Sequence, residues 1–310
     1  MTLSLDQALT GISGILVTPY DERGEIAPER LAPILDRALN AGLHMPVVNG
    51  NTGEFYALTT DEAVTMAREV VALVAGRAPV LAGVGRGLRD AQRLARASAE
   101  AGAVALMVHQ PPDAFVAPRG LVDYMNALAD ASGGLPMMLY LRNDAIGTSA
   151  IAELCSLPGV KGVKWATPNP LRLAEARAAC DPSIVWVGGL AEVWAPVFYA
   201  VGARGFTSGL INVWPGRSLA IHAALEAGDF AKANALIEGM RTFEDIRAEE
   251  MAGTNVTGVK AALIAQGIDC GPTRPPSAWP LTPVQQARLD AFLDANELRA
   301  GAPQRALNRN

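Results

Sequence analysis

A single pattern repeats eight times along most of this chain and limits the folds that it can adopt. Each repeat has a short apolar run, a loop rich in Gly, Pro or Asn, and an amphipathic segment that in many cases ends at a glycine. A glycine in this place is typical of a helix C-terminus. The apolar runs are continuous, as expected for parallel strands that are buried on both faces. The pattern therefore predicts an α/β fold, a TIM (β/α)8 barrel; a doubly wound open sheet is the alternative, although it usually has fewer strands.

The repeats also predict where the barrel begins and ends. The expected strands span residues 12–18, 45–49, 79–84, 103–109, 135–141, 160–165, 183–188 and 205–208. The expected helices between and after them span residues 28–41, 61–75, 88–101, 120–131, 149–154, 171–179, 192–201 and 216–226. The barrel should therefore occupy residues 11–228. Beyond it, three helices are expected to form a C-terminal helical extension (229–300) that packs on the barrel; they span residues 229–250, 257–266 and 282–296.

Composition and charge exclude several classes of partner. The chain has 310 residues, half of them hydrophobic, and a net charge of −5. It has no basic stripe, so nucleic acid and anionic membrane surfaces are not expected as partners. No apolar stretch reaches the roughly 20 residues that span a bilayer. The first ten residues show no signal peptide, and the three widely spaced cysteines form neither a disulfide framework nor a zinc pattern, which predicts a reducing cytoplasm.

The sixth expected strand contains a lysine in its interior, Lys164, in a chain with only four lysines against 22 arginines. A buried ammonium ion loses its hydration and tends to deprotonate. A neutral amine in an apolar pocket is a nucleophile, and with a carbonyl it forms a Schiff base. With side chains alternating along the strand, Lys164 should share a face with Val160 and Gly162. The alternative is that Lys161 or Lys164 only reaches from a strand end to solvent.

In a TIM barrel the active site lies at the carboxyl ends of the strands. Tyr140 and Lys164 are 24 residues apart, about one strand–helix unit, so they should lie on neighbouring strands at similar height. These two are the predicted catalytic residues. The predicted substrate-binding residues lie at other strand ends: Asn51, Thr52 and Gly53 after the second strand, His109 at the fourth, Arg142 after the fifth, Gly188 at the seventh and Ser208 at the eighth.

Several of these residues have a plainer interpretation. The loop at residues 51–54 offers hydroxyl, amide and backbone N–H donors that suit a carboxylate, but it could equally be a helix N-cap. A single histidine at a strand end, such as His109, is more often a hydrogen-bonded wall residue, and Arg142 could form an exposed salt bridge. The Gly-rich segment 83–87 lacks the full dinucleotide fingerprint, so a tight exit from a strand is the better interpretation. No metal-ligand spacing is present.

Five separated motifs resemble the dihydrodipicolinate synthase / N-acetylneuraminate lyase family. They occur in the expected order between about residue 11 and residue 296, at residues 14–20, 50–54, 82–85, 140 and 162–164. Residues 55–58 and 140–144 are more similar to the 5-dehydro-4-deoxyglucarate dehydratase branch of the family than to the true synthases.

The resemblance implies a TIM barrel with C-terminal helices, assembled as a homotetramer (a dimer of dimers). It implies that Lys164 forms a covalent imine with a small-molecule 2-oxo acid and that Tyr140 moves protons. The region of Thr52 and Gly53 would hold the carboxylate of the substrate. It implies no metal and no organic cofactor, because the protonated imine is itself the electron sink.

Three departures from the family pattern affect the expected reaction. Asn51 replaces the first of two threonines, so an amide stands where a hydroxyl could relay protons to Tyr140. Residues 109–115 contain no tyrosine, although many synthases supply one there. Ala145 replaces the arginine that helps synthases bind the aspartate-semialdehyde carboxylate, which disfavours lysine biosynthesis. Arg142 is a candidate to bind an acid group on a different substrate.

The sequence thus predicts a Schiff-base lyase acting on a 2-oxo acid. The reaction is either loss of water, as in a 2-keto-3-deoxy sugar-acid dehydratase, or cleavage of C3–C4, as in a pyruvate-dependent aldolase. The resemblance at residues 140–144 favours the dehydratase, whereas the apolar residues 111–117 suggest a drier pocket than a polyol would need. The alternatives are a synthase-like condensation of pyruvate with an aldehyde, and a homologue that binds a 2-oxo acid without turnover.

Overall fold

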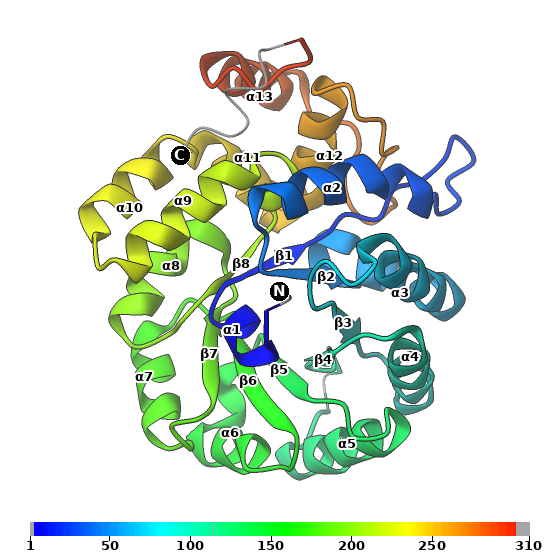
Figure 1. The fold of residues 1–310 in the computed structure, drawn as a ribbon, viewed down its shortest axis with the longest axis vertical. Helices are drawn as coiled ribbons and strands as arrows, with labels where there is room; N and C mark the ends of the chain where they lie inside the picture. Colours follow the sequence, from blue (N-terminus) through cyan, green and yellow to red (C-terminus); the bar gives the residue numbers. More distant parts are fainter. Residues whose placement is uncertain (1–2, 114, 302–310) are drawn as a thin grey trace.

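The computed structural model of the chain describes residues 3–113 and 115–301. Eight parallel strands close into a barrel in chain order, and the last strand pairs with the first (Figure 1). The strands are β1 (Ile12–Ile15), β2 (Met45–Val48), β3 (Leu81–Val84), β4 (Ala105–His109), β5 (Met137–Leu141), β6 (Val160–Trp165), β7 (Val185–Gly188) and β8 (Phe206–Ser208). The prediction of a TIM (β/α)8 barrel is confirmed.

A ring of helices covers the outside of the barrel (Figure 1). The helices of this ring are α2 (Ala32–Ala41), α3 (Thr60–Val74), α4 (Leu88–Ala101), α5 (Pro118–Ala131), α6 (Thr148–Cys155), α7 (Pro170–Ala178), α8 (Ala191–Ala200) and α9 (Pro215–Glu226). Short 3-10 turns lie in the loops: η1 (Pro28–Leu31), η2 (Asn51–Gly53), η3 (Phe55–Ala57), η4 (Asp144–Ile146) and η5 (Leu210–Asn212). A further helix, α1 (Leu5–Leu9), was not expected from the sequence. Its Ala8 and Leu9 pack on the residues inside the barrel, so α1 closes the amino-terminal end.

The strands separate two apolar cores. The inner core fills the barrel and includes Met45, Met107 and Met138, whereas the outer core packs the strands against the helices. Trp165 belongs to the outer core, as the alternation along β6 requires. The expectation that Val160 shares the face of Lys164 is wrong. The pairing of β5 with β6 shifts register between Met137 and Met138, so the alternation is interrupted at the start of β6 and Val160 packs outward.

The C-terminal extension consists of four helices, of which the first lies beside α9 and the other three pack on one another (Figure 1). They are α10 (Phe230–Glu238), α11 (Arg241–Ala252), α12 (Asn255–Ala265) and α13 (Pro283–Ala295). The expectation of one helix over residues 229–250 is wrong, because the chain turns at Gly239 and Met240, and the buried Met240 side chain packs in the outer core. Glu250, Met251 and Ala252 have φ values of 53°, 58° and 64°, so α11 ends in a left-handed turn.

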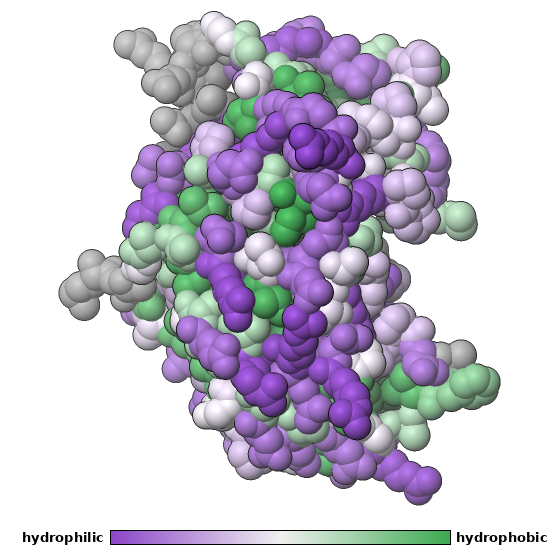
Figure 2. All heavy atoms as spheres, turned by 90° about the vertical axis from the view of Figure 1, so that its right-hand side faces the viewer, coloured by the Kyte–Doolittle hydropathy of each residue, from purple (hydrophilic) through white to green (hydrophobic). Residues whose placement is uncertain are grey.

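The surface is mixed in character. On the face that Figure 2 presents, hydrophilic residues cover most of the area and hydrophobic residues lie in small separate groups. Within residues 3–113 and 115–301, no helix combines the length and the apolar character that crossing a bilayer requires.

A buried ion pair fastens the extension to the loop that follows β2. Lys260 Nζ on α12 lies 2.7 Å from Glu54 Oε1, and the two side chains are 0% and 2% exposed. Lys260 also donates a hydrogen bond to the carbonyl of Pro272 at 2.8 Å. The other carboxylate oxygen of Glu54 accepts the backbone N–H of Arg274 at 2.8 Å, and the Arg274 guanidinium pairs with Glu62. The extension therefore holds the loop at residues 51–57 in place.

Replacing Lys260 by methionine is expected to lower the free energy of unfolding by about 3–5 kcal/mol, because the buried Glu54 carboxylate would lose its cation. Denaturant unfolding followed by circular dichroism measures this change. The exposed Lys232 is the matched control, since its replacement by methionine should change stability by less than about 0.5 kcal/mol. A loss at Lys260 as small as that at Lys232 would contradict the assignment.

Candidate active site

A cavity of about 560 Å³ opens at the carboxyl ends of the strands. Five of the residues predicted from the sequence lie together in its wall: Asn51, Thr52, Tyr140, Arg142 and Lys164. Residues of the extension complete the wall, among them Glu244, Asp245, Arg247 and Asn255. The barrel and the extension thus enclose one cavity between them.

Lys164 is the buried amine of this cavity. It is 3% exposed, whereas Lys161 on the same strand is exposed, so the interpretation in which Lys164 reaches solvent is wrong. Lys164 pairs in register with Tyr140 on the neighbouring strand, and its Nζ lies 3.8 Å from the centre of the Tyr140 ring. Burial, reinforced by the positive charge of Arg142, lowers the pKa of Lys164 to about 7. A large fraction of the amine is therefore neutral and nucleophilic near neutral pH.

The hydroxyl of Tyr140 contacts the loop after β2. Its Oη accepts a hydrogen bond of 2.9 Å from Asn51 Nδ2. Burial raises the pKa of Tyr140 to about 12, so the phenol keeps its proton at neutral pH. Because the amide of Asn51 already donates to the phenol oxygen, the phenol proton is free to point toward another acceptor.

The loop after β2 forms the 3-10 turn η2 rather than a helix cap. The following helix α3 begins at Thr60, and its N-cap is Thr59, so the helix N-cap interpretation is wrong. Thr52 lines the cavity. Gly53 does not: its N–H donates to the carbonyl of Gly50 at 3.0 Å. The structure thus does not bring Gly53 into the wall of the cavity, and Gly53 shapes the turn that presents Asn51 and Thr52.

Arg142 directly follows β5. Its backbone is held by hydrogen bonds, whereas its side chain forms none to a described residue. Gln110 Oε1 accepts the backbone N–H groups of both Arg142 and Asn143 at 2.8 Å, and Gln110 Nε2 donates to the carbonyl of Asn143 at 3.1 Å. In the part of the chain that the structure describes, the Arg142 guanidinium makes no ion pair or hydrogen bond. The exposed salt bridge considered for Arg142 is thus absent from these residues.

His109 is a wall residue behind the cavity. The histidine is completely buried, its Nε2 lies 2.9 Å from the carbonyl oxygen of Asn49, and its ring stacks on Phe55 at 4.4 Å. Burial, with the positive charge of Lys164 as a smaller cause, lowers the pKa of His109 to about 3. This neutral imidazole does not line the cavity, and its ring centre lies 5.0 Å from that of Tyr140.

Gly188 and Ser208, the residues predicted at β7 and β8, do not line the cavity either, because the Cβ direction of Gly188 and the side chain of Ser208 both face the helices. A Cβ on Gly188 would meet Phe198 of α8 at 3.0 Å. Ser208 donates to Glu192 Oε1 on α8 at 2.5 Å and lies 3.1 Å from the hydroxyl of Ser218 on α9. The neighbouring residues in each strand, Gly189 and Thr207, line the cavity in their place. The alternation of side chains along a strand could have identified Thr207. A strand of three or four residues is too short, however, for its sequence to show which side chains face the barrel interior.

Sequence reasoning did not identify the residues that the extension contributes to the cavity. Arg247 on α11 pairs with Glu244, and its Nη2 donates to Asn255 Oδ1 at 3.0 Å. Gly209 allows this approach, because a Cβ there would lie 2.3 Å from Arg247 Nη2. Across the described ranges, no group of three or more His, Cys, Asp and Glu side chains could hold a metal ion.

Fold and cavity together define a TIM barrel with an amine in the wall of its active-site cavity. Over residues 8–296 the chain matches the Dihydrodipicolinate synthetase family, and it belongs to that family of lyases. The resemblance found in the sequence is confirmed.

Relatives with two different names match at similar identity. The 4-hydroxy-tetrahydrodipicolinate synthase of Exiguobacterium sp. is 31% identical over 297 residues, which cover 94% of this chain and 99% of that protein. A probable 5-dehydro-4-deoxyglucarate dehydratase of Streptomyces avermitilis is 32% identical over 268 residues, which cover 84% of this chain and 85% of that protein. Among solved structures, dihydrodipicolinate synthase from Oceanobacillus iheyensis has a TM-score of 0.89 and 36% identity, and the match covers 94% of this chain and 97% of that chain.

Labelling of Lys164 with acetic anhydride is expected to increase with pH through about 7 and to level off above it, because only the neutral amine reacts. Peptide mass mapping after short exposures at each pH measures the rate. N-acetyl-lysine amide is the reference, and its rate should keep rising toward a pKa of about 10.4. A Lys164 rate that follows the reference would contradict the lowered pKa.

Proposed function

We propose that this chain is a Schiff-base lyase that acts on a 2-oxo acid. The observation that carries the proposal is the buried Lys164 amine, which faces Tyr140 in a cavity of about 560 Å³. A lowered pKa makes this amine a nucleophile at neutral pH, and a 2-oxo acid offers the matching carbonyl. The family of the chain supports the lyase class, and the identity of its substrate is part of the proposal.

In the proposed reaction, Lys164 Nζ attacks C2 of the substrate and forms a carbinolamine. The C2 hydroxyl then leaves as water, with its proton supplied by the phenol of Tyr140, and a protonated imine remains on Lys164. The imine withdraws electrons and acidifies the hydrogens on C3. The Tyr140 phenolate left by the previous step removes one of these hydrogens as a proton, which restores the phenol and leaves an enamine on Lys164. The carboxylate at C1 binds at the η2 turn, where Thr52 lines the cavity and has no side-chain hydrogen bond to any described residue.

The protonated phenol favours dehydration over carbon–carbon cleavage. Loss of water from C4 needs an acid that protonates the departing hydroxide, whereas cleavage of C3–C4 needs a base that removes the C4 hydroxyl proton. With its pKa raised to about 12, Tyr140 carries its proton again once it has taken up the C3 hydrogen, so it is the acid that the departing C4 hydroxide needs. The described residues within 111–117 do not line the cavity, so their apolar character does not argue against a hydroxylated substrate. We therefore propose a 2-keto-3-deoxy sugar-acid dehydratase.

A second candidate is condensation of pyruvate with an aldehyde. The synthase of Exiguobacterium sp. matches over 99% of its own length, which favours this activity. Ala145 counts against it, because the family arginine for the aldehyde partner is missing at this position. Dehydration and condensation would both proceed through an imine on Lys164, so only analysis of the products distinguishes the two reactions.

Borohydride trapping tests the proposed class, and product analysis tests the reaction. Incubation with pyruvate and sodium borohydride should leave a reduced adduct on Lys164 and none on the exposed Lys161, as read by peptide mass mapping. With 5-dehydro-4-deoxyglucarate, the expected product has lost one water and no pyruvate is released. Release of pyruvate would overturn the dehydratase assignment, and absence of any adduct in folded protein would overturn the Schiff-base class.

Replacing Tyr140 by phenylalanine separates imine formation by Lys164 from proton transfer by the phenol. The variant should still give some trapped adduct, but its turnover should fall by about 10²–10⁴-fold, the usual contribution of a positioned general acid. Circular dichroism spectra that match those of the native protein serve as the control for folding.

We also propose that the chain assembles as a homotetramer, a dimer of dimers, in a reducing cytoplasm. Cys155, Cys180 and Cys270 are free thiols in the structure, in keeping with a reducing compartment. Size-exclusion chromatography with light scattering should give four times the chain mass of 32.4 kDa. A mass of one or two chains at micromolar concentration would contradict the tetramer.

A further inference from the structure

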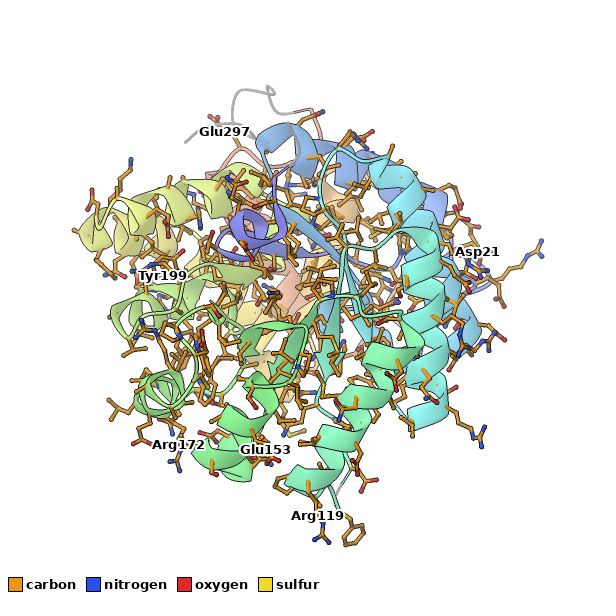
Figure 3. The ribbon with its side chains drawn as sticks, turned by 60° about the horizontal axis from the view of Figure 1, so that its bottom comes forward. Asp21, Arg119, Glu153, Arg172, Tyr199 and Glu297 are labelled. Atoms are coloured by element: carbon orange, nitrogen blue, oxygen red, sulfur yellow. The ribbon has the colours of Figure 1, made fainter. Side chains whose placement is uncertain are left out.

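Two thiols that the proposed reaction does not use meet between two helices of the outer ring. Cys155 is the last residue of α6, and Cys180 lies just after α7. The two helices are neighbours, and in Figure 3 the labelled Glu153 marks α6 and the labelled Arg172 marks α7. The side chains of Cys155 and Cys180 are hydrogen-bonded to each other. Tertiary packing therefore brings together two cysteines that lie 25 residues apart in the sequence.

The two thiols differ in their access to solvent. Cys155 is 5% exposed and packs in the outer core. Cys180 is half-buried, and both of its neighbours in the chain, Ala179 and Asp181, are exposed. A small molecule in solution can therefore reach the sulfur of Cys180 more easily than that of Cys155.

The hydrogen bond between the thiols makes the two sulfurs chemically different. Burial raises the pKa of both thiols, and the hydrogen bond raises the pKa of Cys155 further but opposes the increase at Cys180. Cys155 is therefore the donor, and the sulfur of Cys180 is the acceptor. Because a sulfur that accepts a hydrogen bond carries negative charge more readily, Cys180 is the better nucleophile of the two.

A covalent bond between these sulfurs would join the segments that lead into two neighbouring strands. Residues 155–180 contain the whole of β6 and α7, and Cys180 comes shortly before β7. Both cysteines thus lie toward the amino-terminal ends of these strands, whereas the cavity opens at the carboxyl ends. A cross-link that closes a loop of this length lowers the conformational entropy of the unfolded chain. The bond would therefore stabilise the barrel without touching the candidate active site.

We propose that Cys155 and Cys180 form a reversible disulfide, which stabilises the barrel when its surroundings become oxidising. The oxidant is a small-molecule disulfide, for which glutathione disulfide is the probe. The site is a redox-sensitive pair of thiols, separate from the cavity and independent of the substrate of the enzyme.

The reaction consists of two thiol–disulfide exchanges. The Cys180 thiolate attacks one sulfur of the oxidant, which forms a mixed disulfide and releases one small thiolate. The Cys155 thiolate then attacks the Cys180 sulfur and releases the second small thiolate. Two protein thiols are thus oxidised to one disulfide, and one small disulfide is reduced to two thiols. The two protons of the protein thiols end on the released thiolates.

Incubation of the folded, reduced chain with glutathione disulfide tests the proposal. The expected product is lighter by two hydrogens, and trypsin should release the peptide 143–161 joined to the peptide 178–204. This linked form should exceed the form with glutathione on Cys180 at least about 10-fold, because the second thiol is held in contact with the first. Dithiothreitol should reverse the link, and the link should form faster at alkaline pH, where more of each thiol is ionised.

Thermal unfolding followed by circular dichroism measures the stabilisation. The linked protein should melt about 3–6 °C above the reduced protein. Cys155→Ala and Cys180→Ala should form no internal link, and the oxidant should not raise their melting temperatures. The matched control is Cys270→Ala, which removes a buried thiol that lies 3.9 Å from the carbonyl oxygen of Lys260, and it should form the link as the native protein does.

Several results would overturn the proposal. They are no linked peptide in folded protein, a link that forms only in denaturant, a link to Cys270, a disulfide between two chains, or glutathione that stays on Cys180 without being displaced. A linked protein that melts no higher than the reduced protein would overturn the stabilising role. If Cys155→Ala does not fold, the half-buried Cys180→Ala decides in its place.

Discussion

The active site depends on a lysine amine that the barrel has removed from water without giving it a counter-charge. No carboxylate pairs with Lys164 among the described residues, and its Nζ lies over the face of the Tyr140 ring. An isolated buried charge is unfavourable, so the amine releases its proton more readily than it would in water. The surroundings that destabilise the ammonium form thus make the amine reactive, and the substrate is left to bring the negative charge.

The extension and the barrel loop depend on each other through a buried pair of opposite charges. The carboxylate of Glu54 is satisfied by Lys260 and by the backbone of Arg274, all of it out of contact with water. Glu54 directly follows the η2 turn, so the pair sets the height of Asn51 and Thr52 above the barrel. Helix α11 in turn supplies the opposite wall. The predicted substrate-binding residues and Lys164 therefore lie on separate segments, which come together only through tertiary packing.

The sequence predicted the positions that follow from strand period and spacing. Lys164 and Tyr140 share a register because one strand–helix unit separates them, and β6 occupies the expected residues. Ser208 was misplaced because β8 has only three residues, too few for a pattern that shows which face is buried. Gly53 was misplaced because its N–H is used within its own turn, which depends on backbone angles. Arg247 and Asn255 were not found because their place in the cavity depends on long-range packing of α11 and α12.

The hydrogen bond from Asn51 to Tyr140 determines where the phenol proton can go. A phenol has one proton to give, and its oxygen can also accept a hydrogen bond. A threonine at residue 51 could accept the phenol proton and pass on its own, which would make the tyrosine part of a relay. The amide donates to the phenol oxygen instead, at 2.9 Å, so the proton of Tyr140 is left for the substrate. In the proposed reaction this arrangement makes Tyr140 an acid beside the imine, and an acid serves the departure of hydroxide better than the abstraction of a hydroxyl proton.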